Sequence, residues 1–201
     1  MVQLLREIRI LIRKEILLEL RQRYALNGML LYIISTVVVC YFGFGPNSGA
    51  LAQESWAWNT LFWIILLFTA INAIAKSFAQ ERQGRLIYYY TLASPQSIIV
   101  SKIIYNSLLM LLLSLTGYAI YSVVLGNPVE DNLLFLINMG LGAVGFSSTL
   151  TMVSGIAAKA GNNSVLMAIL SFPVMIPLLL LLIKVSKNAM DGLGRAAAAR
   201  S

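Results

Sequence analysis

The sequence contains no histidine and only one cysteine, Cys40. Without histidine, the chain lacks the side chain that most often serves as a general base and as a ligand of haem or a transition metal. A single cysteine cannot form an intrachain disulfide or a CxxC redox pair, so we expect Cys40 to serve in packing. We therefore expect this chain to bind no metal or cofactor directly.

The sequence also lacks the motifs of common catalytic sites. It has no G-x-x-x-x-G-K-[ST] loop, so the chain is not expected to be a P-loop ATPase itself, and it has no H-E-x-x-H or G-x-S-x-G motif. Its long apolar runs contain no Asp or Glu, the residues that a proton relay inside a membrane would need. We expect a protein that is not an enzyme.

Charged residues are scarce, at 11% of the 201 residues, whereas 59% are hydrophobic. The charges cluster between long apolar runs and do not alternate along helix faces as they do in soluble amphipathic helices. The net charge of +7 lies beside these runs, where anionic lipid and the positive-inside rule explain it better than nucleic acid does. The composition predicts an all-α integral membrane protein with lipid, and no nucleic acid, around it.

Apolar runs of suitable length predict a bundle of about five transmembrane helices, because a bilayer core of about 30 Å needs roughly 20 helical residues. The spans are expected at Leu26–Phe44, Trp56–Ala75, Ile103–Leu125, Leu133–Ala158 and Ser164–Ile183. They form a predicted permease domain over residues 25–193. A basic segment precedes the first span and no A-x-A site follows it, so this span is expected to remain in the mature protein.

The distribution of Lys and Arg predicts the orientation of the spans. The segment before the first span contains Arg6, Arg9, Arg13, Lys14, Arg21 and Arg23, and the connection between the second and third spans contains Lys76, Arg82, Arg85 and Lys102. The connections after the first and third spans contain no basic residue and carry Glu54, Glu130 and Asp131. By the positive-inside rule, the N-terminus is cytoplasmic.

Two groups of residues are predicted to lie on the outer side of the membrane, across from the N-terminus. Trp56, Trp58 and Trp63 are expected at or near the outer interface, where amphipathic rings are favoured. Lys184 and Lys187 follow the fifth span on the same side and disagree with the charge rule, although long lysine side chains can reach an interface.

Residues 1–24 show the pattern of an amphipathic helix in the cytoplasmic interface. At 100° per residue, one half of the helix carries Leu4, Leu5, Ile8, Leu11, Ile12, Ile16 and Leu18, and the other half carries Arg6, Arg9 and Arg13. Glu15 and Glu19 interrupt the apolar half, and Glu19 forms an i,i+4 pair with Arg23. Two interpretations remain open, a membrane anchor or a ridge that docks another cytoplasmic surface.

The connection over residues 76–102 is the longest polar stretch and is predicted to be cytoplasmic. A short helix is expected up to Gly84, followed by a break at Ser94–Pro95 and a helix restart before Lys102. An ordinary solvated loop is one interpretation. The grouping of Glu81, Arg82 and Arg85 with three successive tyrosines favours the other, a protein contact.

The last two spans contain patterns that concern helix packing. Ala143, Ser147, Thr151 and Gly155 form a stripe of small residues, which favours close helix packing over the lining of a path. Pro173 and Pro177 predict a bend in the last span, either a static kink or a hinge. Asn72 and Asn138 are intramembrane amides, for which hydrogen-bonded packing is the preferred interpretation.

The order of these parts resembles permease subunits of the ABC-2 exporter type and, more closely, the cytochrome c biogenesis haem exporter protein B family (CcmB). The resemblance rests on Arg13–Glu15, Glu19–Arg21, Phe78–Gly84, Leu92–Pro95, Ser101–Lys102, Leu125–Gly126, Gly140–Ser154 and Phe172–Pro177. Members of that family usually have a sixth span, whereas residues 194–201 here form an alanine-rich tail. A truncated product is one explanation for this difference.

The resemblance implies a role in c-type cytochrome maturation in a bacterial inner membrane. It implies a separate ABC ATP-binding subunit that binds ATP, a haem-handling membrane subunit, paired transmembrane subunits, and haem as a possible cargo. The residues assigned by this analogy to an ATPase-coupling interface are Glu15, Glu19, Arg23, Glu81, Arg82, Gly84 and Arg85. An ABC-2 permease for a lipid, glycan or drug, and a scaffold that transports nothing, remain alternatives.

Overall fold

The computed structural model describes residues 2–21, 23–44, 54–74, 93–159 and 164–191. These residues form helices and contain no β-strand. The helices are α1 (Val2–Arg21), α2 (Arg23–Phe44), α4 (Ser55–Ile74), α7 (Pro95–Leu125), α8 (Asn132–Lys159) and α9 (Ser164–Met190). The all-α fold expected from composition is confirmed.

Five of these helices are long and apolar enough to cross a membrane, as the sequence predicts. Two of them extend further than expected. Helix α7 begins at Pro95, which confirms the helix restart predicted there, and it continues without a break into the span expected from Ile103. Helix α9 continues to Met190, seven residues past the expected Ile183. Lys184 and Lys187 therefore both lie inside α9, and Lys187 is in its last turn, where a cation interacts favourably with the helix dipole.

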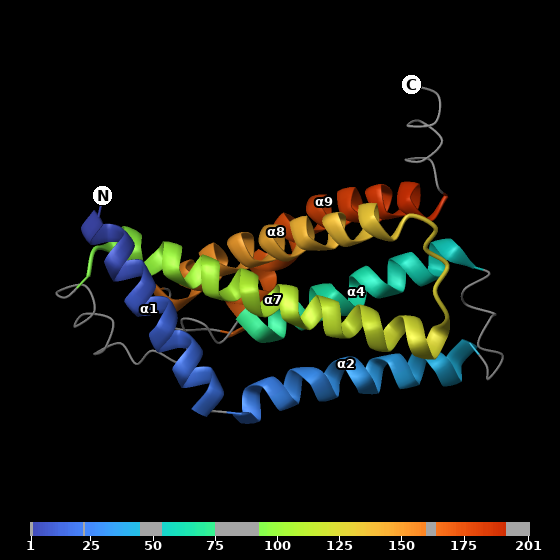
Figure 1. Cartoon of the computed structure of the whole chain (residues 1–201), viewed down its shortest axis with the longest axis horizontal. Helices are drawn as coiled ribbons and strands as arrows, with labels where there is room; N and C mark the ends of the chain where they lie inside the picture. Colours follow the sequence, from blue (N-terminus) through green and yellow to red (C-terminus); the bar gives the residue numbers. More distant parts are fainter. Residues whose placement is uncertain (1, 22, 45–53, 75–92, 160–163, 192–201) are drawn as a thin grey trace, which may run out of the picture.

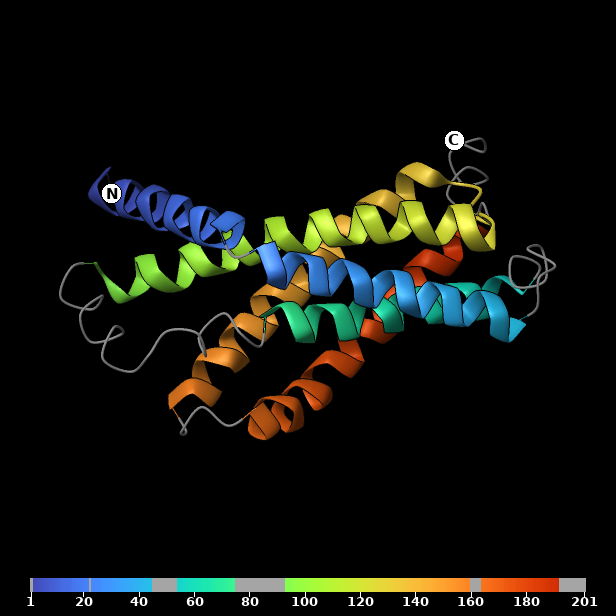
Figure 2. The same ribbon diagram turned by 90° about the horizontal axis from the view of Figure 1, so that it is seen from below.

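Helix α4 lies at the centre of the bundle and contacts α2, α7, α8 and α9. Of its most apolar stretch, 67% is buried, compared with 17% for α2 and 22% for α9. Figures 1 and 2 show the spans lying roughly lengthwise, with α1 crossing α7 near one end. The exposed apolar side chains of α2 and α9 fit a lipid environment, because lipid replaces water around a membrane bundle.

An aromatic cluster joins α4, α7 and α8 where α4 begins and α7 ends. It consists of Trp58, Phe62, Tyr118, Tyr121 and Phe135, with ring centroids 4.8 Å apart for Trp58 and Tyr121 and 5.5 Å apart for Phe62 and Phe135. The Trp58 indole donates to the Gly126 carbonyl at 2.9 Å, and the Tyr121 hydroxyl donates to the Trp58 carbonyl at 3.1 Å. We call this end of the bundle the aromatic end.

The three tryptophans of α4 have different environments. Trp56 is 65% exposed, as expected for a ring in a membrane interface. Trp58 and Trp63 are fully buried, and the Trp63 indole donates to the Ser186 hydroxyl at 2.8 Å. The rings of Trp58 and Trp63 therefore belong to the core between helices, and of the three tryptophans only Trp56 has an exposed ring.

Buried amides connect α9 to its neighbours. Asn138 donates to the Leu182 carbonyl at 2.9 Å and to the Ser186 hydroxyl at 2.7 Å, as the packing interpretation predicts. Asn59, which the sequence analysis did not single out, donates to the Ile183 carbonyl at 2.8 Å. Asn72, in contrast, is exposed near the end of α4. Pro173 and Pro177 lie inside α9, which remains helical through both of them.

Candidate functional site

Helix α1 packs against the first half of α7 at the end of the bundle opposite the aromatic cluster, which we call the basic end (Figure 1). Glu7 of α1 bonds to Ser97 of α7, and Glu15, further along α1, bonds to Lys102, further along α7. The two helices therefore run in the same direction (Figure 2). The contact is rich in polar groups. We define the polar seam as Glu7, Glu15 and Glu19 of α1 with Ser94, Ser97, Lys102 and Tyr105 of α7 and its cap.

The first part of the polar seam lies at the N-terminus of α7. Ser94 is the N-cap, and its hydroxyl accepts a hydrogen bond from the Ser97 backbone N–H at 3.3 Å. The Glu7 carboxylate accepts hydrogen bonds from the Ser94 N–H at 3.2 Å, the Ser94 hydroxyl at 3.2 Å and the Ser97 hydroxyl at 2.6 Å. A carboxylate here also compensates the positive end of the helix dipole. Glu7 thus forms part of the cap of another helix.

The second part is an ion pair between the two helices. Lys102 Nζ lies 3.4 Å from Glu15 Oε1, and the Lys102 side chain is only 2% exposed. Lys14 Nζ lies 3.0 Å from the same oxygen. A lysine buried to this extent needs a charged partner. Glu15 supplies it, so the carboxylate that was expected to meet protein meets α7 of its own chain.

The third part of the polar seam lies nearest to the first transmembrane span. Glu19 lies beside Tyr105. Glu19 Oε1 and the Tyr105 hydroxyl are buried, and within the described ranges neither has a hydrogen-bond partner. A buried unsatisfied polar atom is costly. Among the three parts of the polar seam, this one therefore has the least complete hydrogen bonding of its buried polar atoms.

Helix α7 is connected to α8 by side-chain hydrogen bonds just beyond the polar seam. Asn106 donates to the Thr151 hydroxyl at 2.9 Å. The Ser107 hydroxyl lies 2.9 Å from the Ser147 hydroxyl, which donates to the Ile103 carbonyl at 3.0 Å. Two members of the small-residue stripe thus face α7. The other two, Ala143 and Gly155, are buried and half-buried.

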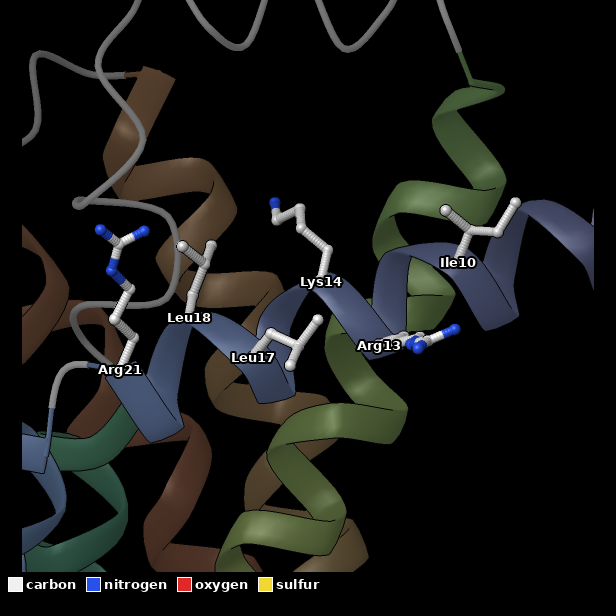
Figure 3. Close-up of a pocket in the computed structure, with 6 residues that line it drawn as sticks. All are labelled: Ile10, Arg13, Lys14, Leu17, Leu18 and Arg21. Carbon is white, nitrogen blue, oxygen red and sulfur yellow. The ribbon is translucent and has the colours of Figure 1, made fainter.

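The side of α1 next to the polar seam is basic and apolar. It includes a groove of about 380 Å³, shown in Figure 3, which is lined by Ile10, Arg13, Lys14, Leu17, Leu18 and Arg21. The expected apolar half of α1 is divided between the two sides. Ile8 is buried, whereas Leu5 and Ile16 are exposed, at 61% and 40%.

The other residues of the predicted coupling interface lie partly outside the described residues. Glu81, Arg82, Gly84 and Arg85 lie outside the described residues, and Arg23 is the first residue of α2. The sequence patterns did not indicate four of the contact residues, Glu7, Ser94, Ser97 and Asn106. For Asn106 a signal existed, since an amide within an apolar run is costly without a partner. In the part of the chain that is described, no group of three possible metal ligands occurs.

Comparison with known proteins identifies a family. The family model described as "CcmB protein" matches residues 6–200. No match was found among curated proteins or among solved structures. Because the family match covers nearly the whole chain and the structure supplies several apolar spans, this multi-pass membrane protein belongs to the CcmB family, the permease components of haem exporters in cytochrome c maturation.

Proposed function

We propose that this chain is a permease subunit that converts ATP binding and hydrolysis by a partner subunit into haem transport or into release of a haem-loaded chaperone. The family supports an ABC-type complex with an ATP-binding partner. The basic residues support placement of the basic end in the bacterial cytoplasm. A haem-handling membrane subunit and a second transmembrane subunit complete the proposed assembly.

The observation that carries this proposal is the continuous polar connection from α1 through α7 to α8. Glu15 and Lys102 join α1 to α7 by an ion pair, and Asn106 and Thr151 join α7 to α8 by a hydrogen bond. Helix α7 is unbroken between these contacts. A displacement of α1 or of the start of α7 by a partner would therefore move helices inside the membrane.

The chain's own residues have defined tasks in this proposal. Glu7 holds the start of α7, and Glu15 neutralises the buried Lys102 while joining the two helices. The predicted coupling residues Glu81, Arg82, Gly84 and Arg85 precede the Ser94 cap in sequence. A partner bound there would act on the start of α7. The sequence provides no histidine for haem ligation, so ligation is assigned to partner chains.

The proposal is tested by exchanging the charges of the ion pair. E15K and K102E are each expected to lower c-type cytochrome maturation at least tenfold, because each places like charges side by side in a buried contact. The double variant E15K/K102E restores opposite charges and should recover most of the activity. Maturation is measured in a strain that lacks the native gene, together with the amount of protein in the membrane.

A matched control is E130K, which makes the same charge change at an exposed carboxylate near the aromatic end. It should leave maturation unchanged. Co-purification of the ATP-binding subunit and its ATPase activity are measured for every variant. Normal maturation in both single variants would contradict coupling through the polar seam, and normal maturation without a bound ATPase would favour a scaffold.

A further inference from the structure

The groove on α1 next to the polar seam has the properties of an anion-binding surface. Arg13, Lys14 and Arg21 line it, and none of its lining residues within the described ranges is acidic (Figure 3). Lys14 shares its charge with Glu15. Arg13 and Arg21 are exposed and, within the described ranges, make no ion pair with a carboxylate. Two arginines of one helix are thus available to an anionic group from outside the chain.

The same groove also presents apolar surface. Ile10 and Leu17 are 59% and 57% exposed, and Leu18 is 44% exposed. Three large aliphatic side chains beside two arginines match a ligand that has an anionic group and a hydrocarbon part. Inorganic phosphate would use only the arginines, and it would leave the aliphatic side chains in water.

The position of the groove indicates the source of this ligand. Arg21 is the last residue of α1, and the first transmembrane span begins at Leu26, five residues later. The groove half that contains Leu17, Leu18 and Arg21 is therefore close to the membrane surface. At this level phospholipids supply phosphate and hydrocarbon together, whereas an acidic protein partner would supply mainly the charge.

We propose that the α1 groove binds an anionic phospholipid of the adjacent leaflet. Arg21 binds its phosphate group at the membrane end of the groove, Arg13 adds positive charge about 12 Å further along the helix, and Ile10, Leu17 and Leu18 contact its acyl chains. The carboxylate-bearing side of α1 remains on α7, so the lipid and α7 occupy different sides of the same helix, with Lys14 between them. This site differs from a general membrane anchor because it depends on particular arginines and not on the total charge of α1.

The experiment compares two double variants of equal net charge. R13Q/R21Q removes both groove arginines, whereas R6Q/R9Q removes two exposed arginines of α1 that do not line the groove. Binding of phosphatidylglycerol and of phosphatidylcholine to the purified full-length chain in detergent is measured by native mass spectrometry. R13Q/R21Q should weaken the first phosphatidylglycerol about 10- to 30-fold, since each basic residue near a lipid headgroup contributes roughly a factor of five.

Three results complete the test. R6Q/R9Q should change the affinity less than threefold, and the charge-conserving R13K/R21K should retain most of it. Thermal unfolding of each variant shows that the loss does not arise from misfolding. Equal weakening by the two double variants, or equal affinity for phosphatidylcholine, would overturn a specific site. Loss of ATPase binding with unchanged lipid binding would assign the groove to the protein partner instead.

Discussion

The two ends of the bundle are held together by different chemistry. At the aromatic end, Trp58, Phe62, Tyr121 and Phe135 are almost completely buried, and the indole and hydroxyl groups of Trp58 and Tyr121 bond to backbone carbonyls. At the basic end, α1 and α7 meet through carboxylates, serines and one buried lysine, and Glu19 Oε1 has no bond within the described part of the chain.

This difference indicates different mechanical properties. Interlocked rings have few alternative arrangements of similar energy, because close packing leaves no space for them. A polar contact can exchange one partner for another at small cost, since each contribution is modest and can be replaced. We expect the aromatic end to determine stability and the basic end to determine activity. Substitutions at each end test that division.

The largest expected effect is at the aromatic end. W58A removes a fully buried ring that contacts four other rings, and we expect it to lower the free energy of unfolding by about 3–5 kcal/mol, since the surrounding helices cannot fill the cavity. Unfolding in mixed detergent micelles measures the change. W56A is the control, because its ring is 65% exposed. A similar loss in both variants would contradict a packed cluster at this end.

An intermediate effect is expected one turn deeper, where α8 approaches α4. A Cβ atom on Gly142 would lie 2.7 Å from the ring of the fully buried Trp63 and 3.3 Å from Leu182. G142A should therefore cost about 1–3 kcal/mol of unfolding free energy through overpacking.

Gly140 provides the matched control on the same helix, because a Cβ atom there meets no atom within 4 Å. G140A should be neutral or slightly stabilising, since alanine favours the helix. Thermal unfolding of the two variants in one detergent makes the comparison. Equal destabilisation would show that α8 resists any added methyl group and that Trp63 is not the cause.

The smallest effect on stability is expected at the basic end. E7Q keeps the shape of the side chain but removes the charge that faces the Ser94 and Ser97 donors and the start of α7. We expect a loss of about 1 kcal/mol, because the charge-assisted bonds become ordinary ones. The fractional loss of cytochrome maturation should exceed the fractional loss of unfolding free energy. A large loss of stability with unchanged maturation would reverse the proposed division between the two ends.

The existence of the spans could be predicted from sequence, because a long apolar run has few alternatives to a membrane helix. The helix restart predicted at Ser94–Pro95 is confirmed, because Ser94 is the N-cap of α7, but the unbroken continuation of that helix into the third span was not predicted. Residues 95–102 include two serines and a lysine, so hydropathy places the boundary too late, although Ser94–Pro95 is a good helix start signal. The true start depends on α1, which buries Ser97 and Lys102.

The partners of individual polar residues were mostly beyond prediction. A helical wheel shows that Glu15 and Glu19 share a side of α1, but it does not reveal which helix covers that side. Asn72 and Asn138 have similar sequence surroundings, yet only Asn138 is buried, because α9 packs beside it. Likewise, a tryptophan near the end of a span fits a lipid interface and a core equally well until its neighbours are known.

The length of α7 has a geometric consequence. Its 31 residues extend about 46 Å, about 16 Å more than the hydrocarbon core requires. The aromatic cluster fixes the C-terminal end of α7. The helix can therefore act as a lever that pivots at that cluster, with Ser94 at its free end. A tilt of about 10° about that pivot would move the tip by roughly 7 Å and the Asn106–Thr151 contact by about half that distance. A large displacement of the start of α7 at the membrane surface would thus produce a smaller displacement of α7 against α8 within the bilayer.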